Sequence, residues 1–225
     1  MKVSLFFLGM IRDFLFKWKV WVPRVRNLST MSQNQRCFVG IEFSEEVKQQ
    51  IAQIQTSARN LNVIDGNWEA PHKFHLTLRF LGDISQEQIE ILKNRLSNLT
   101  TPSFSCLISN KIDHFTGAQP PIRVLWLHLD GMKDLQREVD QLIGTTEPFS
   151  VKGRELERIV NQNHEFHVTL LRVKKMLKGK SLCLKELNNL STEASNIEQP
   201  VKYVSLFRSD LKTGQYDVLE RFSLP

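Results

Sequence analysis

A seven-residue frame, H-x-F-H-x-T-L, occurs twice in this chain of 225 residues. It reads HKFHLTL at 72–78 and HEFHVTL at 164–170, so the copies begin 92 positions apart. On a strand, successive side chains point to opposite faces. Each copy would therefore bury two aliphatic residues and present a histidine beside a threonine. The repeat predicts two similar strands in one fold.

The polar faces of the two copies carry His75 with Thr77 and His167 with Thr169. If the two halves of the chain pack about a pseudo-twofold axis, these four side chains converge on one cleft. Opening a cyclic phosphodiester requires one proton to be taken from water and one to be given to the leaving oxygen. Histidine titrates near neutral pH and suits both tasks. The threonine hydroxyls can donate hydrogen bonds to phosphate oxygens and stabilise charge in the transition state.

From Arg36 onward the chain alternates predicted strands and helices, which indicates an α+β fold with two similar halves sharing a sheet surface. Ser44 is a candidate helix N-cap, and Ser85 with Gln88 forms a capping-box pattern. We expect a loop at 65–67 and an irregular, polar segment over 174–199, with a short helix near 182–190. Predicted strands cover 36–43, 74–80, 104–108, 122–129, 166–173, 201–208 and 215–224, the last two as a hairpin.

Residues 1–30 differ from the rest of the chain. They carry six Lys or Arg against the single acid Asp13, so residues 31–225 have 24 basic and 23 acidic residues. A helix here would have an apolar stripe, which is typical of an interfacial segment. A signal peptide is a second reading, but Arg12 and Asp13 interrupt its apolar region and no small-residue cleavage site follows. A third reading is an upstream extension of the reading frame, because the stretch that Met31 opens resembles a natural start. No apolar run reaches the roughly eighteen residues of a spanning helix. We expect a basic extension outside the fold, a domain over 31–225 and no stable membrane insertion.

Cys37, Cys106 and Cys183 are widely spaced and odd in number. This argues against a disulfide framework or a thiolate metal site and favours a reducing, cytoplasmic location. We expect each to be a small buried residue.

The outer histidines of the frame allow a metal alternative. His72 and His164 complete two H-x-x-H pairs, and four such nitrogens could bind zinc. On a strand, however, residues three apart point to opposite faces, and Pro71 places His72 outside the strand. We therefore expect no metal and no other cofactor. His114 and His128 lack partner spacing, and we expect them to be structural or exposed.

The stretches HLTLRFLG (75–82) and HVTLLR (167–172) resemble the paired H-x-T-x signatures of the two-histidine (2H) phosphoesterases. Within this superfamily the chain is similar to the bacterial and archaeal RNA 2′,3′-cyclic phosphodiesterases, also called LigT-like 2′-5′ RNA ligases. The similarity covers 36–225, is looser over 150–165 and leaves out 1–30. It includes the opening strand and helix at 36–51, the middle strand at 122–135 and the closing hairpin at 206–224.

The resemblance implies two pseudo-symmetric lobes with antiparallel sheets around a central cleft, with helices outside. It implies metal-independent hydrolysis of an RNA-terminal 2′,3′-cyclic phosphate to a 2′-phosphomonoester, and a reverse reaction that joins RNA ends. By position, His75 would be the general acid toward the leaving 3′ oxygen and His167 the general base toward water. The reverse direction exchanges these roles. Thr77 and Thr169 would hold the phosphate.

The resemblance also implies that Arg172 contacts phosphate and that Phe80 stacks on the terminal base. Strict alternation contradicts both placements. It puts Arg172 opposite His167, so a bulge or the end of the strand must turn it. It also puts Phe80 on the core face, where packing is the alternative to stacking, and Arg79 on the face of His75.

The paired motifs and the resemblance leave three alternative hypotheses for the function. The leading hypothesis is an RNA-end cyclic phosphodiesterase. A second is a 2H esterase for small cyclic nucleotides or 2′-5′ oligoadenylates, which the near-neutral charge of 31–225 favours because long RNA prefers a basic track. A third is a non-catalytic module that binds RNA ends. The expected partners are RNA ends or small cyclic nucleotides, and we expect a monomer.

Overall fold

The computed structural model describes residues 34–118, 120–145, 148–149, 159, 164–190, 196–210 and 212–225. The predicted N-terminal extension, with its helix and targeting alternatives, lies outside these residues. So does most of the loosely matched 150–165 segment. In the part of the chain that is described, no helix is long and apolar enough to cross a bilayer.

Two antiparallel sheets form the fold, which confirms the predicted α+β class. The first sheet has the order β3-β1-β8-β9. Its last two strands form the predicted hairpin, with neighbouring strands paired antiparallel throughout. The strands are β1 (Gln35–Glu42), β3 (His75–Ile84), β8 (Tyr203–Asp210) and β9 (Gln215–Ser223).

The second sheet has the order β2-β6-β5-β4-β7 and is also antiparallel. Two of its strands lie where we expected irregular chain. β2 replaces the predicted loop at 65–67, and β7 lies at the end of the predicted polar segment. Both strands are short, and their sequences show no alternation of apolar and polar residues that would predict a strand. Backbone pairing with a neighbouring strand, β6 for β2 and β4 for β7, defines them instead. The strands are β2 (Ile64–Trp68), β4 (Phe104–Thr116), β5 (Ile122–Asp130), β6 (His167–Met176) and β7 (Ile197–Val201).

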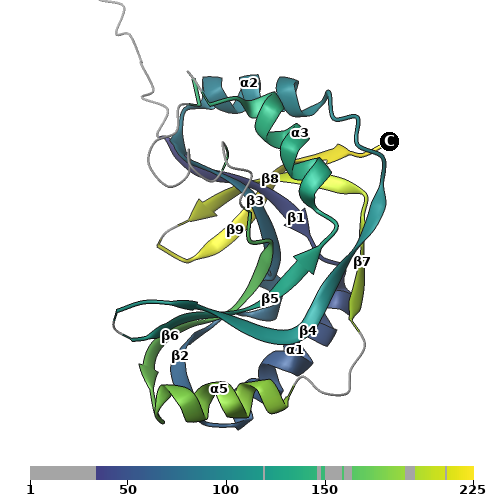
Figure 1. Ribbon diagram of the computed structural model, residues 1–225. Helices are drawn as coiled ribbons and strands as arrows, with labels where there is room; N and C mark the ends of the chain where they lie inside the picture. The colour runs from purple at the N-terminus through teal and green to yellow at the C-terminus, as the bar shows by residue number, and fades with distance from the viewer. Residues whose placement is uncertain are drawn as a thin grey trace, which may run out of the picture. The chain divides into compact units, whose positions relative to one another are not determined.

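Helices lie on the outer sides of the two sheets (Figure 1). The Ser44 cap and the complete Ser85–Gln88 capping box begin α1 and α2 as predicted. Between β2 and β3 the chain makes one short 3-10 turn, η1 (Pro71–Lys73). The helices are α1 (Glu45–Asn60), α2 (Gln86–Leu96), α3 (Lys133–Ile143) and α5 (Lys180–Asn189).

The two lobes are not successive halves of the chain, in contrast to the simplest expectation from the repeated frame. The first sheet takes β1 and β3 from the N-terminal part and β8 and β9 from the C-terminal end. Helix α3, which precedes β6 in the sequence, packs against β3 and α2 of the other lobe. Conversely, α1 contacts β7 of the second sheet. The chain thus crosses repeatedly between lobes, which ties them into one compact unit.

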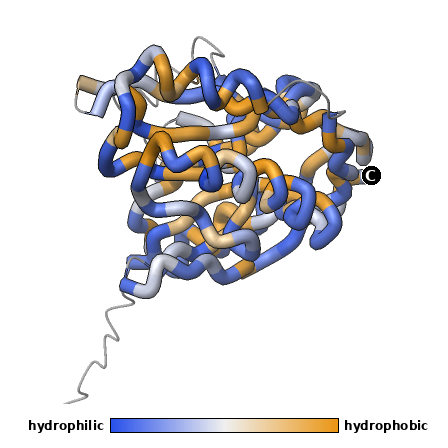
Figure 2. The backbone as a smooth tube through the Cα atoms, turned by 90° about the horizontal axis from the view of Figure 1, so that it is seen from below, coloured by the Kyte–Doolittle hydropathy of each residue, from blue (hydrophilic) through white to orange (hydrophobic). Residues whose placement is uncertain are grey.

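Hydrophobic and hydrophilic segments alternate along the chain, as expected for elements with one buried face (Figure 2). The aliphatic residues of both frames, Leu76 and Leu78 with Val168 and Leu170, are at most 2% exposed. The three cysteines are free and buried, as predicted. The frames therefore anchor their strands in the core from one face and leave the other face for the site.

Candidate active site

Each frame contains a bulge at the same place. In the β1–β3 pairing Val39 faces Arg79 while Gly40 faces Thr77, so Leu78 is skipped. The β5–β6 pairing skips Leu170 in the same way. A bulge adds one residue to a strand and reverses the alternation beyond it. The fifth residue after each inner histidine therefore returns to the face of that histidine.

The bulges decide the placement of Arg172 and Phe80. Arg172 turns onto the face of His167 and lines the cavity described below, through the bulge that the alternation argument required. Phe80 is 60% exposed and lines the same cavity. The core-packing alternative for Phe80 is therefore wrong. Phe80 and Arg172 occupy matching positions, each five residues after the inner histidine of its frame. One lobe therefore presents an aromatic ring to the cavity where the other presents a guanidinium group.

Arg79 is moved by the same bulge to the core, and the expectation that it shares the face of His75 is wrong. Its side chain is 0% exposed, with Nη1 3.0 Å from Asp140 Oδ1. Nη2 donates to the Gly144 carbonyl, and Gln136 Nε2 donates to the other Asp140 oxygen at 3.0 Å. Arg79 therefore joins β3 to α3 behind the site and takes no part in the cleft.

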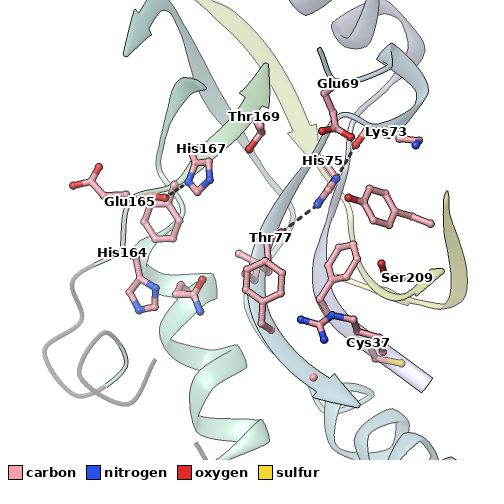
Figure 3. A pocket seen from close by; sticks show the side chains of 18 of the residues that line it. Cys37, Glu69, Lys73, His75, Thr77, His164, Glu165, His167, Thr169 and Ser209 are labelled. Carbon is pink, nitrogen blue, oxygen red and sulfur yellow. Dashed lines mark hydrogen bonds between the residues drawn. The ribbon is translucent and has the colours of Figure 1, made fainter. Parts of the chain in front are cut away.

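One cavity collects every site residue that the sequence predicted. Its volume is about 300 Å³, at the lower end of the range for small-molecule sites. Figure 3 shows the two frames facing each other across it, with His75 and Thr77 on one wall and His167 and Thr169 on the other. Phe80 and Arg172 complete the predicted set. Side chains 92 positions apart in the sequence thus share one chamber.

The ring of His75 is held in a defined tautomer. Its Nδ1 lies 2.7 Å from the Lys73 carbonyl oxygen. A carbonyl only accepts hydrogen bonds, so Nδ1 carries a proton. Nε2 lies 3.1 Å from the Thr77 hydroxyl oxygen, which can donate to the neutral ring. Nε2 is therefore the nitrogen available for proton transfer.

His167 repeats this arrangement on the opposite wall. Its Nδ1 lies 2.7 Å from the Glu165 carbonyl oxygen, again two residues earlier in the chain. Aromatic rings flank both imidazoles. The ring centroids of Phe38 and Tyr216 each lie 4.9 Å from that of His75. The ring centroids of Phe115 and Trp126 lie 5.0 and 5.7 Å from that of His167. Both rings thus have fixed tautomers and apolar surroundings.

These surroundings determine the resting charge of the pair. Burial lowers the pKa of His75 to about 4, with further lowering by the charges of His167 and Arg172. Burial also lowers the pKa of His167 below its ordinary value, and Arg172 adds to the effect. Both imidazoles are therefore mainly neutral at pH 7 while the cleft holds no anion.

Several cavity residues were missed from the sequence. Phe38 comes from β1, Glu69 follows β2, Lys73 belongs to η1 and Tyr216 comes from β9. Lys73 is a variable position of the first frame and Glu69 lies just before that frame, whereas strand pairing brings Phe38 and Tyr216 to the cavity from distant segments. The signal for these last two was indirect, since they lie in the opening strand and the closing hairpin that resemble the family.

The outer histidines do not form a four-histidine cluster with the inner pair, although His164 lines the same cavity. His72 Nε2 lies 3.2 Å from Gln215 Oε1 at the surface, and His164 Nε2 lies 3.4 Å from Asp140 Oδ2. Within the described ranges, no group of three His, Cys, Asp or Glu side chains is arranged to hold a metal ion. His128 Nε2 lies 3.1 Å from Asp130, on the strand beside His167.

Comparison with known proteins finds similar sequences. The model of the family described as LigT like Phosphoesterase matches residues 41–126. The RNA 2′,3′-cyclic phosphodiesterase of Aquifex aeolicus is 29% identical over 196 residues, which are 84% of this chain and 97% of that protein. The Thermus thermophilus protein of the same name is 29% identical over 198 residues, 84% of this chain and 90% of its own length.

Solved structures share the fold of this chain. A crystal structure of a Thermus thermophilus protein superposes with a TM-score of 0.61 at 25% identity, covering 84% of this chain and 97% of that one. Escherichia coli LigT complexed with 3′-AMP shares the fold, with a TM-score of 0.56 at 20% identity over 86% of this chain and 99% of its own. The partial family match, the relatives at 29% identity and the shared fold make this chain similar to the LigT-like phosphoesterases.

Proposed function

We propose that this protein hydrolyses RNA-terminal 2′,3′-cyclic phosphates to 2′-phosphomonoesters without a metal ion. One observation carries the proposal: two imidazoles, each with Nδ1 bound to a carbonyl two residues earlier, line one cavity beside two threonines. That set can take a proton from water and give one to the leaving oxygen. The names of the Aquifex and Thermus relatives support the same reaction.

The roles of the residues follow from the resemblance and the geometry. His167 takes a proton from the attacking water, and His75 gives one to the 3′ oxygen as its bond to phosphorus breaks. The 2′ oxygen keeps the phosphate. Thr77, Thr169 and Arg172 line the cavity where they can bind non-bridging oxygens. With the 5′ hydroxyl of a second RNA end in place of water, the same attack on phosphorus and loss of the 3′ oxygen would form a 2′-5′ linkage. In the reverse of either reaction, the two histidines exchange roles.

This assignment requires the bound phosphate to change the charge of His75. A ring with a pKa of about 4 carries almost no proton at pH 7. An anion beside it favours the charged form and offsets the repulsion from Arg172. The substrate would therefore supply part of the electrostatics that make His75 an acid. His75 would therefore become protonated, and able to act as the acid, only when the cleft holds the substrate.

Phe80 provides an exposed ring for the terminal base, beside the phosphate position. Its ring centroid lies 6.1 Å from that of Phe38, which in turn stacks on Phe207 at 4.7 Å. A base stacked on Phe80 would extend this aromatic row, and base stacking tolerates all four bases. The complex of Escherichia coli LigT with 3′-AMP is consistent with a nucleotide in such a cleft.

A second candidate is hydrolysis of small cyclic nucleotides or 2′-5′ oligoadenylates. The cavity volume of about 300 Å³ favours it, because that space suits about one nucleotide. The near-neutral charge of residues 31–225 points the same way. The third hypothesis, a module that binds without turnover, is less consistent with two complete histidine and threonine pairs. The cytoplasmic location and the monomeric state stay predictions.

The decisive assay is incubation with an oligoribonucleotide ending in a 2′,3′-cyclic phosphate, in the presence of EDTA. We expect conversion to a 2′-phosphate end, identified by mapping which hydroxyl retains the phosphate. A mononucleotide 2′,3′-cyclic phosphate, assayed in parallel, separates the two candidate substrates. Loss of activity in EDTA that zinc restores would contradict the metal-free reaction. End binding without turnover would favour the non-catalytic module.

A further inference from the structure

The cavity proposed to bind an anion also contains a carboxylate, Glu69. Figure 3 shows Glu69 beside His75 at the wall of the cavity. Its backbone is fixed: the amide donates to the Leu170 carbonyl at 2.9 Å, and its carbonyl accepts from Gln55 Nε2 at 2.8 Å. The same Gln55 nitrogen donates to the Leu170 carbonyl at 2.9 Å. The residue is thus anchored to the bulge of the second frame, next to Thr169.

The position of the Glu69 side chain is not explained by a stabilising contact of its carboxylate with the described residues. Among the residues the structure describes, no ion pair or side-chain hydrogen bond of its carboxylate is found. The cavity also contains the cations Arg36, Lys73 and Arg172, and Glu165 lies on the opposite wall (Figure 3). Burial raises the pKa of the Tyr216 phenol, and the charge of Glu69 raises it further while Arg172 opposes the change. The carboxylate therefore acts on the interior of the cleft.

We propose that Glu69 is a charge filter that disfavours the doubly charged phosphomonoester product relative to the singly charged cyclic substrate. This inference rests on the proposed function. A cyclic phosphodiester carries one negative charge, whereas a phosphomonoester has a second pKa of about 6 and carries nearly two at neutral pH. A fixed carboxylate repels the second charge in addition to the first. Glu69 would thereby weaken product inhibition and promote product release.

The size of the effect follows from Coulomb's law. Two unit charges about 8 Å apart, at an effective dielectric constant of about 20 to 80, change a binding constant by roughly threefold to thirtyfold. Neutralising Glu69 should therefore strengthen product binding by that factor beyond any gain in substrate binding. Below pH 6 the product loses its second charge, and the extra factor should disappear.

The test compares Glu69→Gln with the wild-type protein and with Glu87→Gln, which removes an exposed carboxylate on α2. Two constants are measured at pH 7.5 and pH 5: the inhibition constant of the product 2′-AMP, and the Michaelis constant for the substrate, adenosine 2′,3′-cyclic phosphate. We expect Glu69→Gln to lower the ratio of the inhibition constant to the Michaelis constant by roughly threefold to thirtyfold at pH 7.5. The ratio should stay unchanged at pH 5 and in Glu87→Gln at both values.

Charged and titratable groups facing Glu69 also respond to pH. Those that line the cavity with Glu69 are Arg36, Cys37, Lys73, His75, His164, Glu165, His167, Arg172 and Tyr216. Because these groups are present in both proteins, comparing the ratio of Glu69→Gln with that of the wild-type protein at the same pH removes most of their contribution. An unchanged ratio in Glu69→Gln at pH 7.5 would overturn the inference. A raised Michaelis constant at both pH values would also overturn it, because Glu69 would then accept a hydrogen bond from the substrate. Absence of turnover in the wild-type protein would instead refute the proposed function.

Discussion

Filling the cleft with an anion should raise the pKa of His75. Burial lowers the pKa of this ring to about 4, against an ordinary value of 6.5. Protonating the ring in the empty cleft is therefore about 3 kcal/mol less favourable than protonating an exposed imidazole. An anion about 4 Å from the ring, at an effective dielectric constant of about 20, contributes about 4 kcal/mol in the opposite direction. The pKa should thus return to about 6.5 or higher.

Sulfate suits this measurement because its charge does not change between pH 4 and 8. The ring signals of His75 are followed by NMR across this range, without sulfate and at saturation, with chloride added to match ionic strength. His75→Gln identifies the signals. Because protonation and anion binding are linked, the affinity for sulfate should also rise as pH falls from 7 toward 4. If sulfate shifts the signals of the cleft while the pKa of His75 stays near 4, the proposed electrostatics are wrong.

Four further predictions concern individual side chains. His75→Ala and His167→Ala should each lower kcat by about 10²- to 10⁴-fold with circular dichroism unchanged, and near-full activity in either would remove its assigned role. Arg79→Met should lower the free energy of unfolding by about 3–5 kcal/mol, because it leaves the buried Asp140 carboxylate without its guanidinium partner; adding Asp140→Asn should recover part of the loss in a urea titration. Phe80→Ala should raise the Michaelis constant at nearly constant thermal stability, with a cost of about 1–3 kcal/mol in binding; a fall in melting temperature instead would indicate packing. The lowered pKa of His75 means that the unfolded chain binds more protons between pH 6.5 and 4, so native stability is lost as pH falls through this window, and a urea titration at each pH should find a smaller loss in His75→Gln.

The sequence was informative wherever a local pattern determines structure. The Ser44 cap, the Ser85 capping box and the apolar faces of the frames depend on neighbouring residues, and the structure has them as predicted. Alternation failed where a bulge intervened. Skipping Leu78 moved Arg79 to the core and Phe80 to the cleft, and no residue type in the frame announced the shift. Gly40 gives only a partial signal, since a Cβ there would lie 2.4 Å from the Leu76 carbonyl oxygen.

The remaining misses arise from contacts between distant segments. β2 contains Asp65, Gly66 and Asn67, which favour a turn, yet its backbone pairs with β6. Tyr216 reaches the ring of His75 from the last strand of the chain. The interleaving of the lobes likewise depends on where α1 and α3 pack, which periodicity alone does not determine. Tertiary pairing, rather than local propensity, assembled these parts of the site.

The central claim is that two imidazoles act on one phosphorus atom. A crystal structure with 2′-AMP tests it most directly. We expect Nε2 of His75 and Nε2 of His167 each to lie within about 3.2 Å of an oxygen on the same phosphorus, with Thr77 and Thr169 bound to non-bridging oxygens. A phosphate that contacts only one of the two rings, or that binds outside the cleft between the sheets, would contradict the account.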